Sequence, residues 1–534
     1  MSKKILFGEE ARKELKKGVD IVANVVRTTI GPKGRNICMD KGYGGPTVTN
    51  DGVSIAREIV LKDPMQNMSG NLCKEAAEKT NNDAGDGTTT SVILMQAIVA
   101  EGMRKIELGV NAVGVRNGLE KAAEIAIAEL KRIAKPIKQG EETVKVATIS
   151  AESEEIGKVI SDAISQLGEQ AVITVETSPT VGVVSEVSQG MEFDRGFITP
   201  YMMTDPERME AEYRDVSILV TDLRMGMIKE VIPFLDKFMA TGKKELVVIA
   251  DDVTGDSLQT FILNKMRGNF SVLCVKAPGF GTRKGDYLRD IAALTGATLI
   301  SSETGMTFDK VELTDLGAAS RVVSTKDKTT IVGGKGDEKV IKARIASAKK
   351  ELETQESKHD QLKTEERIAK LSGGVAVIKV GAATETATKY LKLKVEDAVN
   401  AVKAALEEGI VAGGGSALLN AAKAILKGKT NDLTSDELIG FDILAIALEA
   451  PLKYIAINAG CGDGSRVVET VKEMGGNAGY DALKGVYVED MVVSGILDPV
   501  KVSRSAISNS VSTAGILITT EVSMVEEKEE EPKI

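Results

Sequence analysis

Residues 81–103 read NNDAGDGTTTSVILMQAIVAEGM, a glycine-rich acidic turn that leads into a long apolar run. The run predicts a helix that begins close to three consecutive threonines, Thr88, Thr89 and Thr90. The free N–H groups of a helix N-terminus attract phosphate, and a carboxylate such as Asp86 is a ligand that Mg²⁺ prefers. Aspartate and threonine are also ordinary helix caps. Taken alone, the stretch leaves both interpretations open and favours the cap.

Two other glycine-rich turns could also hold a phosphate group. They are TTIGPKGRN at residues 28–36 and GIVAGGGSALL at residues 409–419, and the second also opens a predicted helix. No G-x-x-x-x-G-K-[ST] motif is present, so a nucleotide site here is not a P-loop. Hydrolysis of a nucleotide also needs a group that orients water, and a carboxylate is suitable. Asp51 and Asp397 are candidates, although a carboxylate of either kind is more often a solvated surface residue.

Length and composition restrict the class of protein. A single hydrophobic core stops growing at roughly 250–300 residues, so the 534 residues predict two or three domains. The net charge of −10 argues against a chain built to grip nucleic acid. The four cysteines form no C-x-x-C pair, which indicates neither a zinc site nor a disulfide framework. No run approaches the ~18 apolar residues of a membrane span or forms a signal-peptide core, so we expect a cytoplasmic protein with no membrane partner.

The pattern along the chain predicts a multidomain α/β protein. Residues 1–133 have helical periodicity, with Leu15, Val19, Val22 and Val26 on one stripe. Residues 244–301 alternate strand and helix, ending in a strand at 297–301, which predicts a partly parallel sheet. A charged helical pair is expected at 338–370 and a strand at 371–381, after which the helical texture returns. We therefore expect a mostly helical base built from both chain ends, with an α/β domain inserted.

Two segments of the inserted part are too apolar for helices with one buried stripe. These are MIKEVIPFLDKFMATG at residues 227–242 and SLQTFILNKM at residues 257–266. Helices of this kind are either buried on two sides or present an exposed surface for a partner, because large exposed apolar patches usually mark interaction sites.

The motifs TTIGPKGRN, NDGVSIAREI, DAGDGTTTS, ATISA, KAPGFG, GGVAVIKVGAATE, KVEDAVNA, EEGIVAGGG and GILDPVKV occur in this order along the chain. Together they closely resemble the group I chaperonins, the GroEL family of ring-forming ATPases, from about residue 4 to residue 522. The resemblance implies an equatorial domain at 1–133 and 410–523, an intermediate hinge domain at 134–189 and 375–409, and an apical domain at 190–374. Residues 524–534 are expected to form a disordered acidic tail.

The resemblance also implies the residues of an ATPase site. Asp397 is expected to activate the attacking water, with Asp51 as the second catalytic carboxylate and Asp86 as the Mg²⁺ ligand. Thr29, Asn50 and Thr89 are expected to hold K⁺, although Asn50 stands where the family usually has lysine. The remaining ATP contacts are expected at Ile30, Gly31, Pro32, Gly87, Thr88, Thr90, Ile149, Ser150, Gly414, Asp481, Ala482, Ile496 and Asp498.

The implied function is an ATP-dependent chaperone that captures unfolded polypeptides. Client and lid contacts are expected at Phe197, Tyr201, Met202, Ile232, Leu235, Leu258, Ile262 and Leu263. The implied partners are a GroES-type co-chaperonin and further copies of the chain, in a heptameric ring that stacks on a second ring. An ATP-independent holdase that uses the same surface is the alternative, and an ATPase of unrelated purpose, such as a metabolic kinase, is a third hypothesis.

Overall fold

The computed structural model describes residues 2–40, 46–137, 140–168, 172–206, 208–355 and 357–526. The chain divides into two compact units. The first unit contains residues 1–162, 175–184 and 379–534, and the second contains residues 163–174 and 185–378. Within the described ranges, no helix combines the length and apolar character that a membrane span requires.

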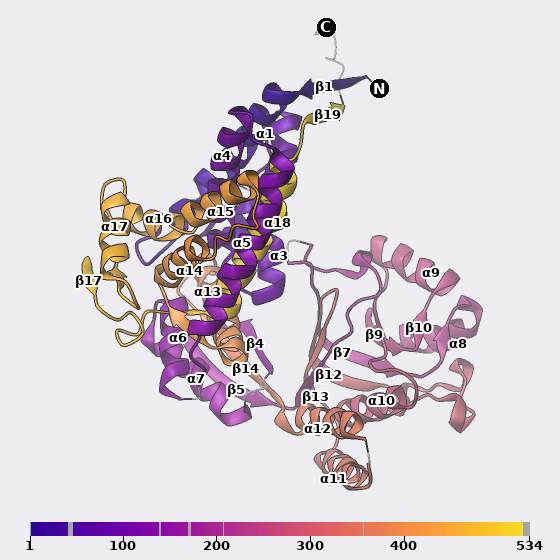
Figure 1. Ribbon diagram of the computed structural model, residues 1–534. Coiled ribbons are helices and arrows are strands. Elements are labelled where there is room, and N and C mark those ends of the chain that lie inside the picture. The colour runs from indigo at the N-terminus through magenta and orange to yellow at the C-terminus, as the bar shows by residue number, and fades with distance from the viewer. Residues whose placement is uncertain are drawn as a thin grey trace. The chain divides into compact units, whose positions relative to one another are not determined.

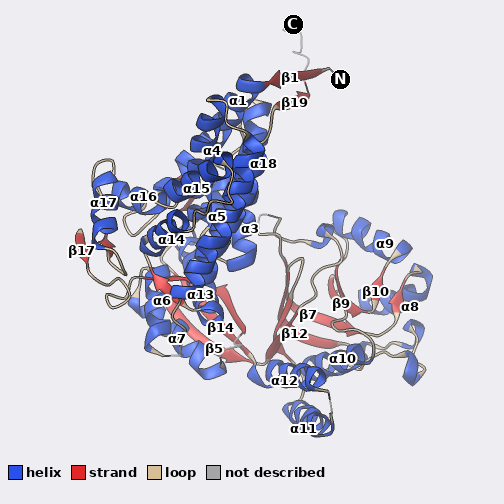
Figure 2. Ribbon diagram, viewed as in Figure 1, coloured by secondary structure: helices blue, strands red, loops and turns tan. Residues whose placement is uncertain are grey.

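The first unit is mostly helical and is built from both ends of the chain (Figures 1 and 2). Its N-terminal elements are β1 (Lys3–Phe7), α1 (Gly8–Val26), β2 (Ile37–Met39), β3 (Thr47–Thr49), α2 (Gly52–Glu58), α3 (Pro64–Ala84), α4 (Thr88–Glu107), α5 (Ala112–Ile133) and α6 (Glu141–Ala151), with a 3₁₀ turn at Arg27–Thr29. Its C-terminal elements are α13 (Glu385–Glu408), β15 (Ile410–Ala412), α14 (Ser416–Lys427), α15 (Ser435–Ala447), α16 (Ala450–Asn458), α17 (Ser465–Met474), β16 (Gly479–Asp481), β17 (Val486–Val488), β18 (Leu497–Pro499), α18 (Val500–Ile518) and β19 (Val522–Glu526).

One hydrophobic core joins the two ends in this unit. The predicted stripe Leu15, Val19, Val22 and Val26 on α1 is fully buried, and the core continues through α3, α4, α5, α14, α15 and α18. In Figure 1 the yellow helix α18 lies among the indigo and purple helices of the N-terminal part. Residues more than 400 positions apart in sequence therefore share one core, which confirms the predicted base made from both termini.

The outermost strands also pair across the length of the chain. β1 and β19 are antiparallel, from Lys3 opposite Glu526 to Phe7 opposite Val522. The ammonium of Lys3 lies 3.0 Å from the carboxylate of Glu526. The prediction of a disordered tail from residue 524 is therefore wrong for residues 524–526, because main-chain pairing with β1 orders them. Residues 527–534 lie outside the described residues.

The second unit contains a six-stranded sheet with helices around it (Figure 2). Its elements are β6 (Gly190–Phe193), β7 (Ala211–Val220), β8 (Arg224–Met225), α8 (Ile228–Met239), β9 (Glu245–Ala250), β10 (Asp252–Val253), α9 (Gly255–Met266), β11 (Ser271–Lys276), α10 (Thr282–Thr295), β12 (Gly317–Ser324), β13 (Thr329–Gly334), α11 (Glu338–Thr354) and α12 (Lys358–Gly373), with 3₁₀ turns at Pro200–Met202, Ser302–Thr304, Phe308–Lys310 and Leu313–Asp315. The strand order is β11-β9-β7-β12-β13-β6. Since β7, β9 and β11 are parallel and the remaining pairs are antiparallel, the partly parallel sheet is confirmed.

Two expected strand boundaries in this unit are wrong. Residues 297–301 form no strand of the sheet; only Ile300 makes a bridge, to Thr221. The strand expected from residue 371 begins at Val375, because α12 continues to Gly373. Ile300 and Leu371 are instead buried by packing in the core of this unit.

Four elements contain the points at which the chain passes from one unit to the other. They are α7 (Glu154–Leu167) and the strands β4 (Val172–Thr177), β5 (Gly182–Ser188) and β14 (Val375–Gly381). The three strands form one small sheet in the order β4-β14-β5. The division into two units does not separate the expected intermediate domain at 134–189 and 375–409 from the rest of the chain. The boundaries of the three expected domains stay a prediction.

The α5–α15 contact generates a test of packing in the first unit. A Cβ added to Gly118 of α5 would lie 2.1 Å from the backbone oxygen of Glu437, which is too close for any side chain. We expect Gly118→Ala to force these helices apart and to lower the free energy of unfolding by about 1–3 kcal/mol. Denaturant-induced unfolding of the full chain measures this change.

Gly515→Ala is the matched control. Gly515 lies in α18 of the same unit, and its nearest neighbour is the aliphatic part of the flexible Arg116 side chain, at 3.2 Å. Alanine also favours a helix over glycine by up to ~1 kcal/mol, so this variant should be as stable as the parent or more so. Equal losses in the two variants would contradict the packing argument.

Candidate functional site

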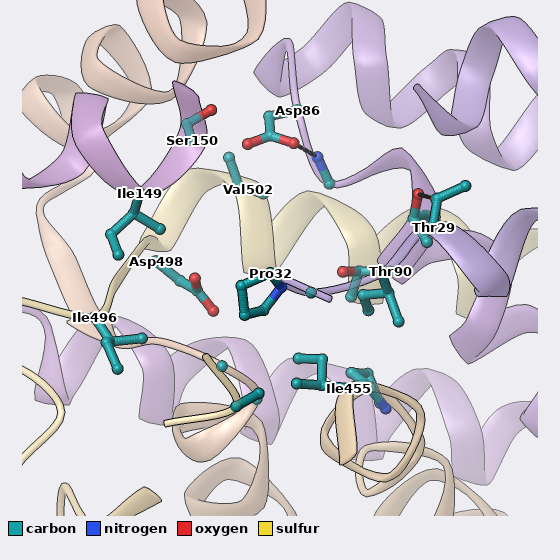
Figure 3. A pocket seen from close by; sticks show the side chains of 18 of the residues that line it. Thr29, Pro32, Asp86, Thr90, Ile149, Ser150, Ile455, Ile496, Asp498 and Val502 are labelled. Atoms are coloured by element: carbon teal, nitrogen blue, oxygen red, sulfur yellow. Dashed lines mark hydrogen bonds between the residues drawn. The ribbon is translucent and has the colours of Figure 1, made fainter. Parts of the chain in front are cut away.

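A cavity of about 440 Å³ in the first unit collects segments from both chain ends. All three glycine-rich turns singled out in the sequence line it, together with the start of α2, the end of α6 and the middle of α13. Figure 3 shows Asp86 from the N-terminal part, Ile149 and Ser150 from α6, and Asp498 from the C-terminal part around one space. The lining includes every residue expected at the ATP and cation site: Thr29, Ile30, Gly31, Pro32, Asn50, Asp51, Asp86, Gly87, Thr88, Thr89, Thr90, Ile149, Ser150, Asp397, Gly414, Asp481, Ala482, Ile496 and Asp498.

The turn before α4 has a geometry that only glycine adopts easily. Gly85 and Gly87 both have positive φ, +71° and +80°, and added Cβ atoms would lie 2.5 Å from Asn400 and Val502 respectively. Gly87 is the N-cap of α4, and no side chain caps this helix. The carboxylate of Asp86 instead accepts a hydrogen bond from the N–H of Gly87 (Figure 3). The alternative of a conventional side-chain cap is therefore excluded, and the first turn of α4 retains its N–H groups for a ligand.

Asp51 has a structural task at the neighbouring helix. Its two carboxylate oxygens accept from the N–H groups of Val53 at 3.3 Å and Ser54 at 3.0 Å, and so cap α2. Gly52 follows directly, and an added Cβ there would lie 2.5 Å from the hydroxyl of Thr89. The absence of a side chain at Gly52 therefore lets α2 and α4 approach each other at the cavity.

Asp397 reaches the cavity from α13, a helix far from α4 in sequence. Burial, together with the charges of Asp51 and Asp86, raises the pKa of Asp397 well above its usual value. Burial and the charge of Asp51 also raise the pKa of Asp86. Several carboxylates thus compete for one poorly solvated space, which favours either their protonation or a bound cation.

Asp498 adds a fourth carboxylate from β18. Pairing of β18 with β15 sets Asp498 opposite Val411, directly before the glycine turn that opens α14. Burial and the charge of Asp86 raise the pKa of Asp498 to about 7, although it accepts hydrogen bonds from the N–H groups of Gly415 and Gly414.

The sequence analysis missed a cation that lines the cavity. The ammonium of Lys394 lies 2.5 Å from the carboxylate of Glu152, and Lys394 is buried. Glu152 has a left-handed backbone, with φ of 54°, at the end of α6. The pair fixes α6 to α13 one helical turn from Asp397, and the charge of Lys394 opposes the raised pKa values of Asp86 and Asp397. No short-range pattern pairs residues 242 positions apart.

A tight turn after β16 forms another part of the lining. Asp481 accepts hydrogen bonds from the N–H groups of Leu483 and Lys484 at 3.1 and 3.0 Å, and its second oxygen lies 3.2 Å from the ammonium of Lys484. Apolar residues that the sequence analysis did not select also line this cavity, among them Leu418, Pro451, Ile455 and Tyr480.

The residues suit the expected cations in their chemistry. In the part of the chain that the structure describes, no three Asp, Glu, His or Cys side chains are grouped to hold a metal by themselves. Mg²⁺ usually takes only one or two protein carboxylates and completes its shell with phosphate and water, which Asp86 can provide for. The hydroxyls of Thr29 and Thr89 lie 3.3 Å apart and are oxygen donors of the kind expected for K⁺.

The residues expected to contact clients lie in the second unit, and they differ in how far their side chains are exposed. Tyr201, Ile232 and Leu263 are exposed, while Leu235, Leu258 and Ile262 are partly buried on α8 and α9. Phe197 and Met202 are 6% and 1% exposed and belong to the core, so in this conformation they are not on the surface, and client contact at them stays a prediction. The main chain of Phe197 bridges Val275, and the sulfur of Met202 accepts from the N–H of Cys274 at 3.2 Å. These contacts hold both side chains inside.

A solved structure shows which class of protein has this fold. The chaperonin gp146 from bacteriophage EL (Pseudomonas aeruginosa), crystallised in the presence of ATP-BeFx, is similar with a TM-score of 0.68. The match covers 98% of this chain and 99% of that chain at 20% sequence identity, so it shows a shared fold.

The sequence itself shows the family. The TCP-1/cpn60 chaperonin family matches residues 22–528, and the chain belongs to this family, in agreement with its group I, GroEL-like motifs. Its multidomain α/β architecture is that of a GroEL-like chaperonin. Members of the family are molecular chaperones that bind unfolded polypeptides and form oligomeric rings.

The raised pKa of Asp498 predicts how stability depends on pH. The folded value, about 7, lies above the value of ~3.9 in an unfolded chain. Asp498 therefore contributes stability that is fully present below pH ~4 and lost as the pH rises through 7. We expect Asp498→Asn, which keeps an acceptor oxygen without the charge, to gain in melting temperature relative to the parent between pH 5 and pH 8. Thermal unfolding without nucleotide measures the difference.

Asp490→Asn supplies the control. Burial alone would raise the pKa of Asp490, but hydrogen bonds from the N–H groups of Val493 and Val492 and from Asn477 hold it below its usual value. Its contribution is complete above pH ~4 and constant from pH 5 to 8. A difference between Asp498→Asn and the parent that stays flat over this range would contradict the assignment.

Proposed function

We propose that this chaperonin binds and hydrolyses ATP in the cavity of the first unit and uses that reaction to drive capture and enclosure of unfolded polypeptides. The observation that carries the proposal is the convergence of Asp51, Asp86, Asp397 and Asp498 with the uncapped N-terminus of α4 around one space. Helix N–H groups attract phosphate, whereas the carboxylates on their own repel it. When a nucleotide binds together with a cation, its phosphates accept hydrogen bonds from the helix N–H groups and the cation neutralises the carboxylates.

Each part of the lining has a task in this proposal. The first turn of α4 and the hydroxyls of Thr88, Thr89 and Thr90 donate to phosphate oxygens. Asp86 holds Mg²⁺, which supplies charge neutralisation of the phosphates when bound. Thr29, Asn50 and Thr89 provide oxygen atoms for K⁺. The apolar side chains, including Ile30, Pro32, Ile455 and Ile496, surround the adenine ring of ATP.

Asp397 acts as the general base. A general base works best when its pKa lies near the operating pH, and burial beside other carboxylates moves Asp397 in that direction. The carboxylate accepts a proton from the attacking water, and Lys394, held by Glu152 one turn away, keeps positive charge close to it. Asp51 supports the site by capping α2, so its role includes positioning.

Asp397→Ala tests the catalytic assignment. Because no contact to phosphate depends on this side chain, we expect ATP binding to persist while turnover falls by about 10²–10⁴-fold, the range of a positioned general base. Nucleotide binding by calorimetry and phosphate release measure the two effects separately.

The matched control is Glu385→Gln on the same helix. Glu385 is exposed, pairs only with Lys389 among the described residues, and does not line the cavity. Its turnover should equal that of the parent. Near-normal hydrolysis by Asp397→Ala would reject Asp397 as the base, and loss of hydrolysis in Glu385→Gln would show a general effect on α13.

Client capture is proposed for the exposed apolar side chains of α8 and α9. Ile232 is 42% exposed, and Leu263 and Met266 are 52% and 73% exposed. Unfolded chains can bury apolar side chains against such a surface at about 25 cal/mol per Å², with little demand on sequence. The exposed methionines add adaptability because their side chains are unbranched and flexible. A GroES-type lid is proposed to bind the same surface in competition with the client.

Ile232→Ser with Leu235→Ser tests this surface. Ile232 is exposed and Leu235 partly buried on α8, so both contribute area to a bound chain. We expect the double variant to lose capture of a denatured client and of the co-chaperonin while its ATPase activity remains, since neither residue lines the cavity. Light scattering of a diluted denatured client and pull-down of the lid measure the two losses.

Val340→Ser is the control for surface hydrophobicity. Val340 is 52% exposed on α11 of the same unit, so this change removes similar apolar area elsewhere. Client capture should be unchanged. Equal client capture by the double variant and the parent would refute the role of α8.

The assembly proposed is a heptameric ring that pairs with a second ring. The alternative is an ATP-independent holdase that uses the same apolar surface. ATPase activity measured with and without an unfolded client and a lid protein separates the two, because a holdase protects clients without nucleotide turnover. A metabolic kinase would instead transfer phosphate to a small acceptor and would ignore the client.

A further inference from the structure

Helix α16, from the C-terminal part of the first unit, packs against the first glycine-rich turn of the cavity, at residues 27–36. Ile455 of α16 lines the cavity, and a Cβ added to Gly31 of the turn would lie 3.1 Å from its side chain. Tyr454 and Asn458 are four residues apart and so share one face of α16. Both contact the turn through polar groups, although more than 400 residues separate them from it in the sequence.

The side-chain amide of Asn458 donates hydrogen bonds to three main-chain carbonyls of this turn. Its Nδ2 atom lies 3.1 Å from the oxygen of Arg27, 3.3 Å from that of Thr28 and 2.9 Å from that of Ile30. An amide has two N–H bonds, so the three acceptors share them. One side chain thus engages three of the four consecutive carbonyls from Arg27 to Ile30.

These carbonyls lie where a helix stops. α1 passes into the 3₁₀ turn Arg27–Thr29, and the backbone is extended at Ile30. The last carbonyls of a helix lack intrahelical partners, and Pro32, one helical turn after Thr28, has no N–H to donate. Part of this deficit is met within the turn, because the N–H of Arg35 donates to the oxygen of Thr28 at 2.9 Å. The amide of Asn458 completes the set from a distant helix.

Tyr454 holds the start of the same turn. The guanidinium of Arg27 lies over the Tyr454 ring, 4.6 Å from its centroid, and donates a hydrogen bond to its hydroxyl at 2.6 Å. A cation over an aromatic face is attracted by the ring as well as by the hydroxyl oxygen. The turn is therefore fixed by its main chain at Asn458 and by a side chain at Tyr454.

The position of the turn decides which groups face the cavity. Thr29, Ile30, Gly31 and Pro32 all line it, and Figure 3 shows Thr29, Pro32 and Ile455 around the same space. The hydroxyl of Thr29 lies 3.3 Å from that of Thr89 on α4. Hydrogen bonds weaken steeply outside a narrow range of about 2.7–3.2 Å, so a small displacement of the turn would weaken its contacts with a ligand.

We propose that Asn458 is a positioning residue for nucleotide binding, whose amide fixes the first glycine-rich turn in the conformation that receives ATP. The inference rests on the proposed ATP site and adds to it a residue that does not line the cavity. Asn458 touches no reacting atom and acts through the main chain of residues 27–30.

The isosteric change Asn458→Asp tests this role, because it removes both donors and sets a carboxylate against three carbonyl oxygens. We expect the KM for ATP, and the dissociation constant measured by calorimetry, to rise by about tenfold or more. The value of kcat per folded protein should stay within about twofold of the parent, since Asp86 and Asp397 are unchanged. A purely structural effect would instead reduce the amount of active protein, which lowers the apparent kcat and leaves KM unchanged.

Hydrogen exchange without nucleotide tests the same inference independently of ATP. The N–H groups of Ile30, Gly34 and Arg35 are hydrogen-bonded within the turn. In Asn458→Asp they should exchange at least about tenfold faster than in the parent, because the turn opens more often. If the parent binds no ATP, the proposed ATP site is wrong, and this measurement still decides whether Asn458 fixes the turn.

Asn420→Asp is the matched control. The amide of Asn420 on α14 donates to the main-chain carbonyl of Gly476 at 2.7 Å, and neither residue lines the cavity. This variant should keep the KM of the parent and the exchange rates of its turn. Asn458→Ala, which removes the amide without adding a charge, should weaken ATP binding in the same direction as Asn458→Asp, and thermal unfolding verifies that both are folded. Parent-like ATP affinity in both Asn458 variants, unchanged exchange of the turn, or an equal rise of KM in Asn420→Asp would overturn the proposal.

Discussion

Mutual repulsion among buried carboxylates is the constraint on which the first unit depends. Asp86 comes from the turn before α4 and Asp397 from α13, more than 300 residues later, and both have raised pKa values because water is excluded and like charges are close. An arrangement of this kind costs folding free energy unless a ligand repays it. The positive charge of Lys394 offsets part of that cost, because it opposes the raised pKa values of both carboxylates. The rest of this unfavourable free energy is relieved when a cation and its phosphate bind. Ligand binding should therefore stabilise the first unit.

Close backbone approach is the second requirement of the site. Positions 52, 85 and 87 admit no Cβ without contact at 2.5 Å, so the helices α2, α4 and α13 and the start of α18 meet only because these residues are glycines. The turn at Gly414 and Gly415, both with positive φ, brings two N–H groups to Asp498. The shape of the cavity thus depends on these five glycines as much as on the side chains that line it.

The resemblance selected residues that share one cavity, but it did not anticipate which apolar residues of the second unit are buried. The motif order was enough to select residues that line one cavity, because glycine turns and acidic residues have few alternative uses in such a combination. The stripe on α1 and the partly parallel sheet followed from periodicity. The burial of Phe197 and Met202 could not be predicted, since an irregular segment has no period that marks its inner face. The Lys394–Glu152 pair was equally invisible, because it depends on a left-handed residue and on two helices that meet only in the folded chain.

The pairing of β1 with β19 has a consequence for synthesis of the chain. The second unit is nearly continuous in sequence, so all of its own contacts can form once residue 378 has been made. The first unit cannot, because its core and its cavity need α18, and its terminal sheet needs residues up to 526. The faces of α3, α4 and α5 that pack against α18 must therefore stay uncovered until α18 has been made, and such species are prone to aggregate. A chaperonin of this kind is therefore itself prone to aggregate while it is being synthesised.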